Sequence, residues 1–334
     1  MSNRVFQLSD FDYELPESLI AQHPAEPRDH SRLLVYNRKN DTITDSRFFE
    51  IPKFLHPETT LVMNNSRVEK ARLLFGNREI FVVNAVNNTT IEAMVRPGRK
   101  FKAGKNVALT DDIEASVLHI HDDGLRTIQF NHPLDHEVFA PHRNTPFPPY
   151  IKPDESLADR YQTVYAKPEG SKAAPTAGLH FTDELLKKLK INGINQAEVT
   201  LHVGLGTFAP VKTENISEHN LHSESWFIGE DNAEKINAAK HITAVGTTSA
   251  RVLESVEMSR GSFRESSGDT QIFIKPGYEF RNMDSIITNF HLPKSTLLMM
   301  IAAFTGYDQM RNIYDHAIRE KYRFYSFGDA MLIL

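Results

Sequence analysis

The sequence contains no cysteine. This absence excludes disulfide bonds, thiolate nucleophiles and cysteine-ligated zinc, and it suits a reducing compartment, so we expect a cytoplasmic protein. Long apolar runs are missing too: the longest, Leu297 to Phe304, is far shorter than the roughly 20 residues of a membrane span and predicts a buried helix. The N-terminal residues lack the basic and apolar regions of a signal peptide. We therefore expect a protein that has no contact with a membrane, and our expectation for its oligomeric state is a monomer.

An excess of basic residues is also missing, because the formal net charge is -5 over 334 residues. Such a chain does not coat nucleic acid, so any binding of RNA would use a local patch. The best patch is the stretch from Val95 to Lys105, which has five cations, no acid and one aromatic residue, Phe101. A solvated hairpin tip is the alternative interpretation. The residues of this stretch that we predict to contact tRNA are Arg96, Arg99, Lys100 and Lys102.

Several catalytic and cofactor motifs are absent. There is no H-E-x-x-H, no compact triplet of metal ligands and no G-x-S-x-G, so we expect no metal ion. Gly204 to Ala209 fits the loose dinucleotide-binding pattern G-x-G-x-x-A after a strand. That motif needs a helix to follow, and the residues from Pro210 to Ser217 have no helical period. A nicotinamide-dependent dehydrogenase is therefore disfavoured.

The distribution of residue types predicts two domains. Between Arg67 and His142 the chain has short β-branched segments separated by glycine and asparagine, and Asp123-Gly124 is a strong hairpin turn, which together predict a small antiparallel β domain. The proline-dense stretch from Pro141 to Pro153 indicates a domain junction. We place an α/β core at 1–66 plus 148–334 and the inserted β domain at 67–147.

In the second half of the chain, helical and strand patterns alternate, which is typical of an α/β domain. The predicted helices begin after Thr182, span Asn232 to Lys240 and Ser249 to Val256, and begin again at Ser295. The predicted strands lie around Val199, at Ile242 to Val245, at Gln271 to Ile274 and at Ile286 to Phe290. Because the strand-to-helix turns of such a sheet share one edge, we expect the polar turns to form a common rim.

Four turns on that rim carry the candidate binding residues. Small residues let the backbone approach a ligand, and a helix N-terminus attracts an anion, although Ser249 as a simple N-cap is an alternative. Strand alternation turns His202 away from the apolar face. The candidates are Thr176, Gly178 and His180 in the first turn; His202, Gly204, Gly206 and Thr207 in the second; Thr247, Thr248 and Ser249 in the third; and His291, Lys294 and Ser295 in the fourth.

Taken together and in this order, these turns resemble the S-adenosylmethionine:tRNA ribosyltransferase-isomerases of queuosine biosynthesis. The resemblance runs nearly end to end through GSKAAPTAGLHFT, VTLHVGLGTFAPV, AVGTTSARVLES, FIKPGYEF and TNFHLPKSTLLM. The family usually has Asn-Asp-Thr-Arg-Val where this chain has Asn64 to Val68, so Asn65 replaces an acid. The resemblance implies an α/β core interrupted by a small antiparallel β-barrel.

The resemblance also implies a reaction. The ribosyl group of S-adenosylmethionine is transferred to 7-aminomethyl-7-deazaguanine at the tRNA wobble position and isomerised to give epoxyqueuosine, with release of adenine and methionine. The sulfonium acidifies the adjacent ribose carbon, so a positioned base can start the reaction, with no cofactor beyond the S-adenosylmethionine that is consumed. We predict His202 as this base, His180 as the second candidate, and Glu224 as the group that balances the sulfonium charge.

Two other functions are alternative interpretations of the sequence. Asn65 is consistent with a tRNA-binding relative that has lost catalysis, but the polar residues of the rim turns are all present. A methyltransferase that uses S-adenosylmethionine should show an acidic-x-G-x-G turn near its N-terminus, and none is found.

Overall fold

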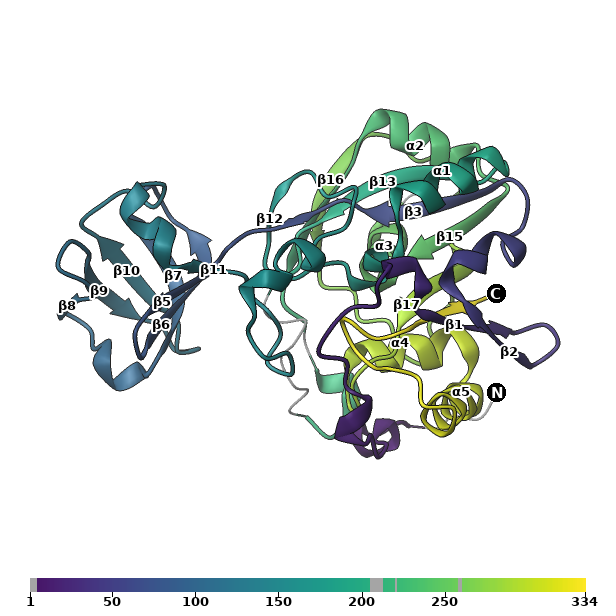
Figure 1. Cartoon of the computed structure of the whole chain (residues 1–334), viewed down its shortest axis with the longest axis horizontal. Helices are drawn as coiled ribbons and strands as arrows, with labels where there is room; N and C mark the ends of the chain where they lie inside the picture. The colour runs from purple at the N-terminus through teal and green to yellow at the C-terminus, as the bar shows by residue number, and fades with distance from the viewer. Residues whose placement is uncertain (1–4, 205–212, 220, 258–259) are drawn as a thin grey trace. The chain divides into compact units, whose positions relative to one another are not determined.

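The structure is a computed structural model that describes residues 5–204, 213–219, 221–257 and 260–334. The chain divides into two compact units (Figure 1). Unit 1 comprises Met1–Arg67, Pro149–Lys152 and Asp159–Leu334, and unit 2 comprises Val68–Pro148 and Pro153–Ala158. No helix in the described part of the chain is long and apolar enough to cross a membrane.

Unit 1 is built on a mixed sheet of nine strands in the order β16-β14-β13-β3-β15-β17-β18-β1-β2. Strand β3 lies between β13 and β15 and is parallel to both. All six of its residues are buried, as is typical of a strand covered on both faces. The strands are β1 (Arg32–Asn37), β2 (Thr42–Arg47), β3 (Thr59–Asn64), β13 (Asn195–Leu201), β14 (Glu224–Ile228), β15 (His241–Val245), β16 (Ser266–Thr270), β17 (Ser285–Asn289) and β18 (Ala330–Ile333).

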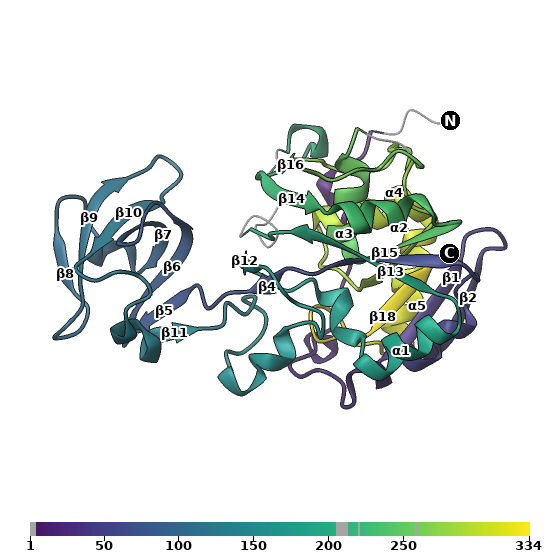
Figure 2. The ribbon, with the colours of Figure 1, turned by 90° about the horizontal axis from the view of Figure 1, so that it is seen from above.

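Helices cover both faces of this sheet. On one face, α2 to α5 pack over the cluster that includes Val62, Ala244 and Ile286. On the other, α1 packs over the cluster that includes Leu61 and Val245, and Figure 2 shows α1 and α3 on opposite sides of the sheet. The helices are α1 (Asp183–Ile191), α2 (Glu230–Asn237), α3 (Gly246–Ser255), α4 (Thr296–Thr305) and α5 (Tyr307–Arg319).

Short 3₁₀ helices and two short strands complete the described elements. The 3₁₀ helices are η1 (Leu8–Phe11), η2 (Glu17–Leu19), η3 (Arg28–His30), η4 (Phe48–Lys53), η5 (Gly98–Lys100), η6 (Glu137–His142), η7 (Glu155–Leu157), η8 (Asp159–Tyr161), η9 (Thr176–His180) and η11 (Ile216–Glu218). The short strands are β4 (Arg67–Val68) and β12 (Glu169–Ser171).

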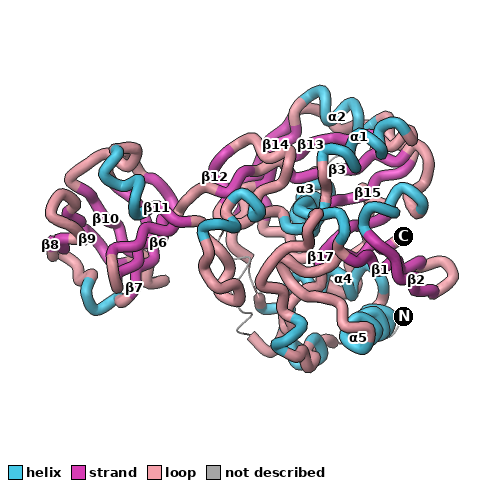
Figure 3. The backbone as a smooth tube through the Cα atoms, viewed as in Figure 1, coloured by secondary structure: helices cyan, strands magenta, loops and turns pink. Residues whose placement is uncertain are grey.

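Unit 2 contains a curled antiparallel half-barrel of seven strands, drawn in magenta in Figure 3. Asp123 and Gly124 lie in the turn between β9 and β10, where Gly124 has φ +88°, a backbone angle that suits glycine. The end strands, β11 and β8, are not paired with each other in the described residues, so the sheet stays open. The strands in sheet order are β11 (Arg143–Asn144), β5 (Arg72–Phe75), β6 (Arg78–Ala85), β7 (Thr90–Arg96), β10 (Arg126–Phe130), β9 (Glu114–Ile120) and β8 (Asn106–Ala108).

Most of the predicted elements in the second half of unit 1 are confirmed, and two predictions are wrong. The strand predicted at Gln271 to Ile274 is absent, and β16 lies just before it because the polar stretch Ser266–Thr270 pairs with β14 at the sheet edge. An exposed edge strand of this kind carries no apolar period. Helix α3 begins at Gly246, three residues before the predicted Ser249.

Candidate active site

A cavity in unit 1 brings the four predicted turns together. It encloses about 680 Å³, counting the space open to solvent. It lies where β15 and β17 end, as expected for the carboxyl edge of parallel strands. The common rim is therefore confirmed. The residues that represent the four turns in its lining are Thr176 from the first, Val203 from the second, Thr247 and Thr248 from the third, and His291 and Ser295 from the fourth.

The third turn presents the first turn of α3 to this cavity. Gly246 has φ +88°, which lets the chain pass directly from β15 into the helix. Gly246, Thr247 and Thr248 all line the cavity. The N–H groups of a helix's first turn have no partner inside the helix, and they favour a ligand with acceptor groups.

Two buried oxygens on the cavity lining have no hydrogen-bond partner among the described residues: Thr248 Oγ1 and Asn289 Oδ1. Buried polar atoms are nearly always paired, so an unpaired oxygen beside a cavity indicates a place for a ligand group. The Thr248 hydroxyl can donate or accept, whereas the Asn289 oxygen can only accept.

A buried network orients the Asn289 amide. Its Nδ2 lies 3.2 Å from His180 Nε2 and 3.1 Å from the Tyr325 carbonyl oxygen. Both partners accept, provided that His180 carries its proton on Nδ1, which is 2.8 Å from Ser31 Oγ. Burial lowers the pKa of His180 to about 4, so its ring is neutral at pH 7. The imidazole therefore holds the amide nitrogen, which leaves Oδ1 for the cavity.

His291 is the histidine that lines this cavity within the described residues. Its Nε2 lies 2.8 Å from Thr288 Oγ1, and its backbone N–H donates to Tyr314 Oη at 3.0 Å. Burial lowers the pKa of His291 to about 3, so the imidazole is neutral at pH 7. A neutral imidazole at the reaction cavity can accept a hydrogen bond, and its free nitrogen is available to accept a proton, but the lowered pKa makes it a weaker base than an exposed histidine.

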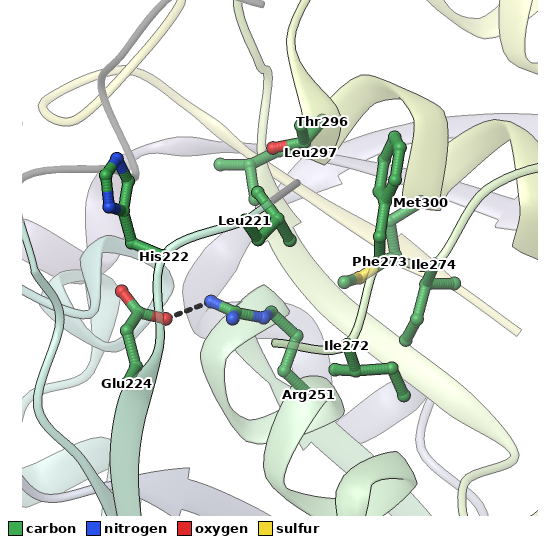
Figure 4. Close-up of a pocket in the computed structure, with 10 residues that line it drawn as sticks. All are labelled: Leu221, His222, Glu224, Arg251, Ile272, Phe273, Ile274, Thr296, Leu297 and Met300. Atoms are coloured by element: carbon green, nitrogen blue, oxygen red, sulfur yellow. Dashed lines mark hydrogen bonds and ion pairs between the residues drawn. The ribbon is translucent and has the colours of Figure 1, made fainter. Parts of the chain in front are cut away.

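A second cavity, of about 410 Å³, lies beside the first, and Leu297 lines both. Figure 4 shows the buried ion pair between Glu224 and Arg251 on its wall. The other oxygen of the Glu224 carboxylate accepts the backbone N–H of Gly204 at 2.9 Å. Because Arg251 already balances the charge of Glu224, the geometry does not support the predicted pairing of Glu224 with a sulfonium.

Comparison with known proteins gives this cavity a context. The model of the family described as "Queuosine biosynthesis protein" matches residues 8–333. The chain belongs to this family. It is 48% identical to the S-adenosylmethionine:tRNA ribosyltransferase-isomerase of Desulfitobacterium hafniense (strain DSM 10664 / DCB-2), over 98% of this chain and 100% of that protein.

Other relatives agree with this assignment. The protein of the same name from Clostridium kluyveri (strain ATCC 8527 / DSM 555 / NBRC 12016 / NCIMB 10680 / K1) is 45% identical over 98% of this chain and 99% of its own length. The crystal structure of S-adenosylmethionine tRNA ribosyltransferase from Thermotoga maritima is 38% identical and has a TM-score of 0.57, over 97% of this chain and 100% of that chain.

Within this family framework, several predicted residues lie away from the cavity. His202 lines neither cavity, and its ring packs against Gly170, where an added Cβ would lie 3.2 Å from Nδ1. His180 is buried in the network behind Asn289. Gly206 and Thr207 lie outside the described residues.

Three further predicted substrate contacts have structural partners within unit 1. Gly178 lies under Tyr165, whose hydroxyl oxygen would be 2.0 Å from an added Cβ, so glycine is needed there for packing. Ser249 is fully buried and donates its hydroxyl to the Val245 carbonyl at 2.9 Å, because α3 has already begun. Lys294 forms an ion pair with Asp12 at 2.7 Å and does not line the cavity.

The basic stretch lies in unit 2, and its cations are exposed. Lys100 Nζ donates to Asn77 Oδ1 at 3.0 Å. Phe101 is fully buried in the core of the unit, so this aromatic ring cannot stack on a base. The four exposed cations that we predict to contact tRNA are Arg96, Arg99, Lys100 and Lys102.

Asn65, which replaces the family's usual acid, lies in a polar network next to β13. Its Nδ2 donates to Glu198 at 2.9 Å, and its Oδ1 accepts from the Thr200 hydroxyl at 2.7 Å. Lys167 holds the same Glu198 carboxylate at 2.7 Å. An ionised aspartate could not donate to Glu198, so the amide is complementary to its surroundings in this chain.

Sequence reasoning missed four residues that line the two cavities: Asn289, Tyr150 and Tyr325 in the first and Arg251 in the second. Asn289 and Arg251 stand inside the motifs that we quoted, but strand and helix patterns explained them as structural. Tyr150 lies in the proline-dense stretch, which the sequence pattern indicated only as a domain junction. Tyr325 has φ +71°, a feature that only a structure reveals. The described residues contain no group of three or more acidic or histidine side chains that could hold a metal ion.

Proposed function

We propose that this protein transfers and isomerises the ribosyl group of S-adenosylmethionine onto 7-aminomethyl-7-deazaguanine at the tRNA wobble position, giving epoxyqueuosine-tRNA. Adenine and methionine leave. Relatives of this name, 45% and 48% identical over nearly the whole chain, support this function. The observation that carries it is the cavity of unit 1, which turns from four parts of the chain line and where two of those turns contribute an unpaired oxygen, Thr248 Oγ1 and Asn289 Oδ1.

The ribose of the donor is the group that we assign to this cavity. It offers hydroxyl donors, which match Asn289 Oδ1, and hydroxyl acceptors, which match Thr248 Oγ1. Holding the ribose at two points would fix the carbon next to the sulfonium, and such positioning supplies much of the rate of a multistep reaction. Three further hydroxyl-bearing residues of the lining complete the proposed donor site: Thr176, Thr247 and Ser295.

For proton transfer we place His291 ahead of His202. A base must lie within hydrogen-bond reach of the proton that it removes. His291 lines the cavity, whereas His202 packs against Gly170 outside the lining. In this proposal the neutral imidazole of His291 accepts the proton from the ribose carbon beside the sulfonium, and Thr288 holds the ring through Nε2.

The tRNA is the partner that we assign to the exposed cations of unit 2. In this proposal the α/β core at 1–66 plus 148–334 binds the donor, and the inserted β domain at 67–147 contacts tRNA. Phosphate contacts by exposed arginine and lysine position a nucleic acid without reading its sequence. We propose a monomer that works where tRNA is modified, in the cytoplasm, with no cofactor besides the co-substrate.

The test is incubation of purified protein with S-adenosylmethionine and tRNA that carries the deazaguanine precursor, followed by nucleoside mass spectrometry. We expect epoxyqueuosine in the tRNA, with adenine and methionine released in equal amounts. Transfer RNA without the precursor is the control and should give neither product. A methyltransferase would release S-adenosylhomocysteine as its main product, and a binding relative without catalysis would release nothing.

A further inference from the structure

The second cavity of unit 1 holds a charged group with unused binding capacity. Arg251 is 7% exposed, and its Nη1 is bonded to Glu224. Its Nε and Nη2 are buried and have no hydrogen-bond partner among the described residues. A buried guanidinium normally satisfies its donors, so two unused N–H groups side by side indicate a place for a ligand group with acceptor atoms.

The position of these two donors specifies the chemistry of that ligand. Nε and Nη2 form one edge of the guanidinium, and their parallel N–H groups match the two oxygens of a carboxylate. Glu224 leaves this edge unoccupied because it is bonded to Nη1. Lys275 lies outside the lining, with its ammonium 5.2 Å from the centre of the ring of Phe273, which does line the cavity.

The rest of the cavity wall is apolar. Figure 4 shows Ile274 and Met300 on the side of the guanidinium opposite Glu224, and Phe273 stands with them. An anion without an aliphatic part would leave these side chains without a partner. A carboxylate that ends a short aliphatic chain satisfies both the guanidinium edge and the apolar wall.

The two cavities are neighbours in unit 1. Leu297 lines both, and the backbone N–H of Gly204, next to Val203 of the first cavity, donates to Glu224 of the second. On α3, Arg251 follows Thr248 by three residues. This separation places the two Cβ atoms about 5 to 6 Å apart on one face of a helix. A donor whose ribose contacts Thr248 could therefore reach Arg251 with its other end.

We infer that Arg251 binds the α-carboxylate of the methionine half of S-adenosylmethionine through Nε and Nη2, and that the second cavity is the amino-acid subsite of the donor. Glu224 is then a positioning residue, which holds the guanidinium so that its side edge faces the ligand. This inference rests on the proposed function, because it takes the donor to be S-adenosylmethionine.

The probe is decarboxylated S-adenosylmethionine, which differs from the donor only in this carboxylate. In the wild-type protein we expect kcat/KM for the intact donor to exceed that for the probe by roughly 100-fold or more, since a bidentate charged contact in a buried site is lost. Equal use of the two donors by the wild-type protein would overturn the inference.

Two variants locate the effect at Arg251. Arg251→Lys keeps the positive charge but lacks the parallel N–H donors of Nε and Nη2. The double variant Arg251→Gln with Glu224→Gln removes both charges, so no unpaired ion stays buried. In both, the preference for the intact donor should fall below about fivefold, mainly through KM, since the contact is one of binding. A variant that melts like the wild type and keeps the full preference would contradict the assignment.

A binding measurement separates this inference from the proposed function. Calorimetric titration of both donors without tRNA needs no turnover, and it should show the same preference and the same loss in the variants. If no ribosyl transfer occurs but this preference holds, the function is wrong and the subsite is right. The matched control is Arg260→Gln, which removes an exposed ion pair with Asp284 and should leave the preference unchanged.

Discussion

Unit 1 and unit 2 differ in what they bury. Among the described residues, unit 2 buries only Thr90 and Thr145 as polar side chains, and the rest of its core is apolar. Unit 1 buries ionisable groups as well as apolar ones. These buried ionisable residues are His180, Glu224, Arg251, Glu254, His291 and Asp329.

This difference indicates that the core of unit 2 serves stability alone, whereas the core of unit 1 also holds groups with a functional role. A buried ionisable group costs desolvation free energy and must be paired, so it persists where chemistry or positioning requires it. Some of these groups in unit 1, such as Glu254, bond only to structural neighbours. His291 and Arg251, by contrast, line cavities. Unit 2 presents its charges on the outside, where they can contact a large partner.

The sharpest test of unit 1 compares its two candidate bases. We expect His291→Gln to lower turnover by roughly 100-fold or more with donor binding retained, because glutamine keeps a polar shape but cannot cycle a proton. His202→Gln, away from the cavity lining, should lose less than about tenfold. Single-turnover rates and donor affinity should be measured for both. If the two results are exchanged, the role of base returns to His202.

In unit 2, the test is removal of the exposed cations. The triple variant Arg96→Gln, Arg99→Gln and Lys100→Gln should weaken tRNA binding by about 10- to 100-fold. It should also lower the slope of log affinity against log salt by about three, because each lost phosphate contact removes about one. Donor affinity should not change.

The control for this test lies on α1 in unit 1. Lysines 187, 188 and 190 are equally exposed, and changing all three to glutamine removes the same charge. Filter binding at several salt concentrations measures both variants. An equal loss in the two would mean that net charge alone attracts tRNA, and an unchanged slope in the unit 2 variant would make the basic stretch a solvated turn.

The buried histidines should make unit 1 sensitive to acid. Folding lowers the pKa of His180 from 6.5 to about 4 and that of His291 from 6.5 to about 3. Above pH 6.5 both histidines are neutral in the folded and in the unfolded state, so neither lowers the free energy of unfolding. As pH falls from 6.5 toward 4, the unfolded chain binds protons that the folded one excludes, so each histidine costs roughly 1.4 kcal/mol of unfolding free energy per pH unit.

Urea unfolding between pH 7 and pH 5 measures this effect. The chain has one tryptophan, Trp226 in β14, so its fluorescence follows unit 1 specifically. His291→Gln should lower the pH dependence measurably, since one of the two most strongly shifted histidines is gone, while His219 and His241, whose pKa values burial also lowers, keep their contribution. A midpoint that is constant across this range would contradict the neutral, buried state of both rings.

The smallest expected effect is a difference in stability between two glycine-to-alanine variants, one in each unit. Gly178→Ala in unit 1 would press a methyl group against Tyr165 and Thr163, and such overpacking costs about 1 to 3 kcal/mol. Gly104 in unit 2 has φ +71° and open space around it, so alanine there costs about 1 kcal/mol through backbone strain alone. Calorimetric melting compares the two. A greater loss of stability from Gly104→Ala than from Gly178→Ala would contradict the packing role of Gly178.

The part of the site that follows the order of strands and helices was predictable. The carboxyl ends of neighbouring parallel strands meet at one edge, so the turns after β15 and β17 had to lie together. The residues that the turns contribute were less predictable. Ser249 follows a strand and precedes a helical period, which suggests a cap, yet the start of α3 at Gly246 changes its position in the helix.

Contacts between distant parts of the chain could not be predicted in this way. Ser31 and His180, which orient Asn289, are 149 residues apart, and no local pattern connects them. Arg251 stands on the face of the α3 period that suits burial. Only the structure shows that two of its donors lack a partner in the described residues. Periodicity predicts which face is buried, but it does not predict which polar atoms remain unpaired there.

The order of strands in unit 1 has a consequence for how the chain folds during synthesis. Strands β1 and β2 are made early, but in the described residues β1 joins the rest of the sheet only through β18, the last of the described strands. Unit 2 pairs mainly strands that are near neighbours in sequence, so it can fold while translation continues. Strand β1 must wait until nearly 300 more residues have been made, and during that time the unpaired backbone N–H and C=O groups of its edge need protection from other chains.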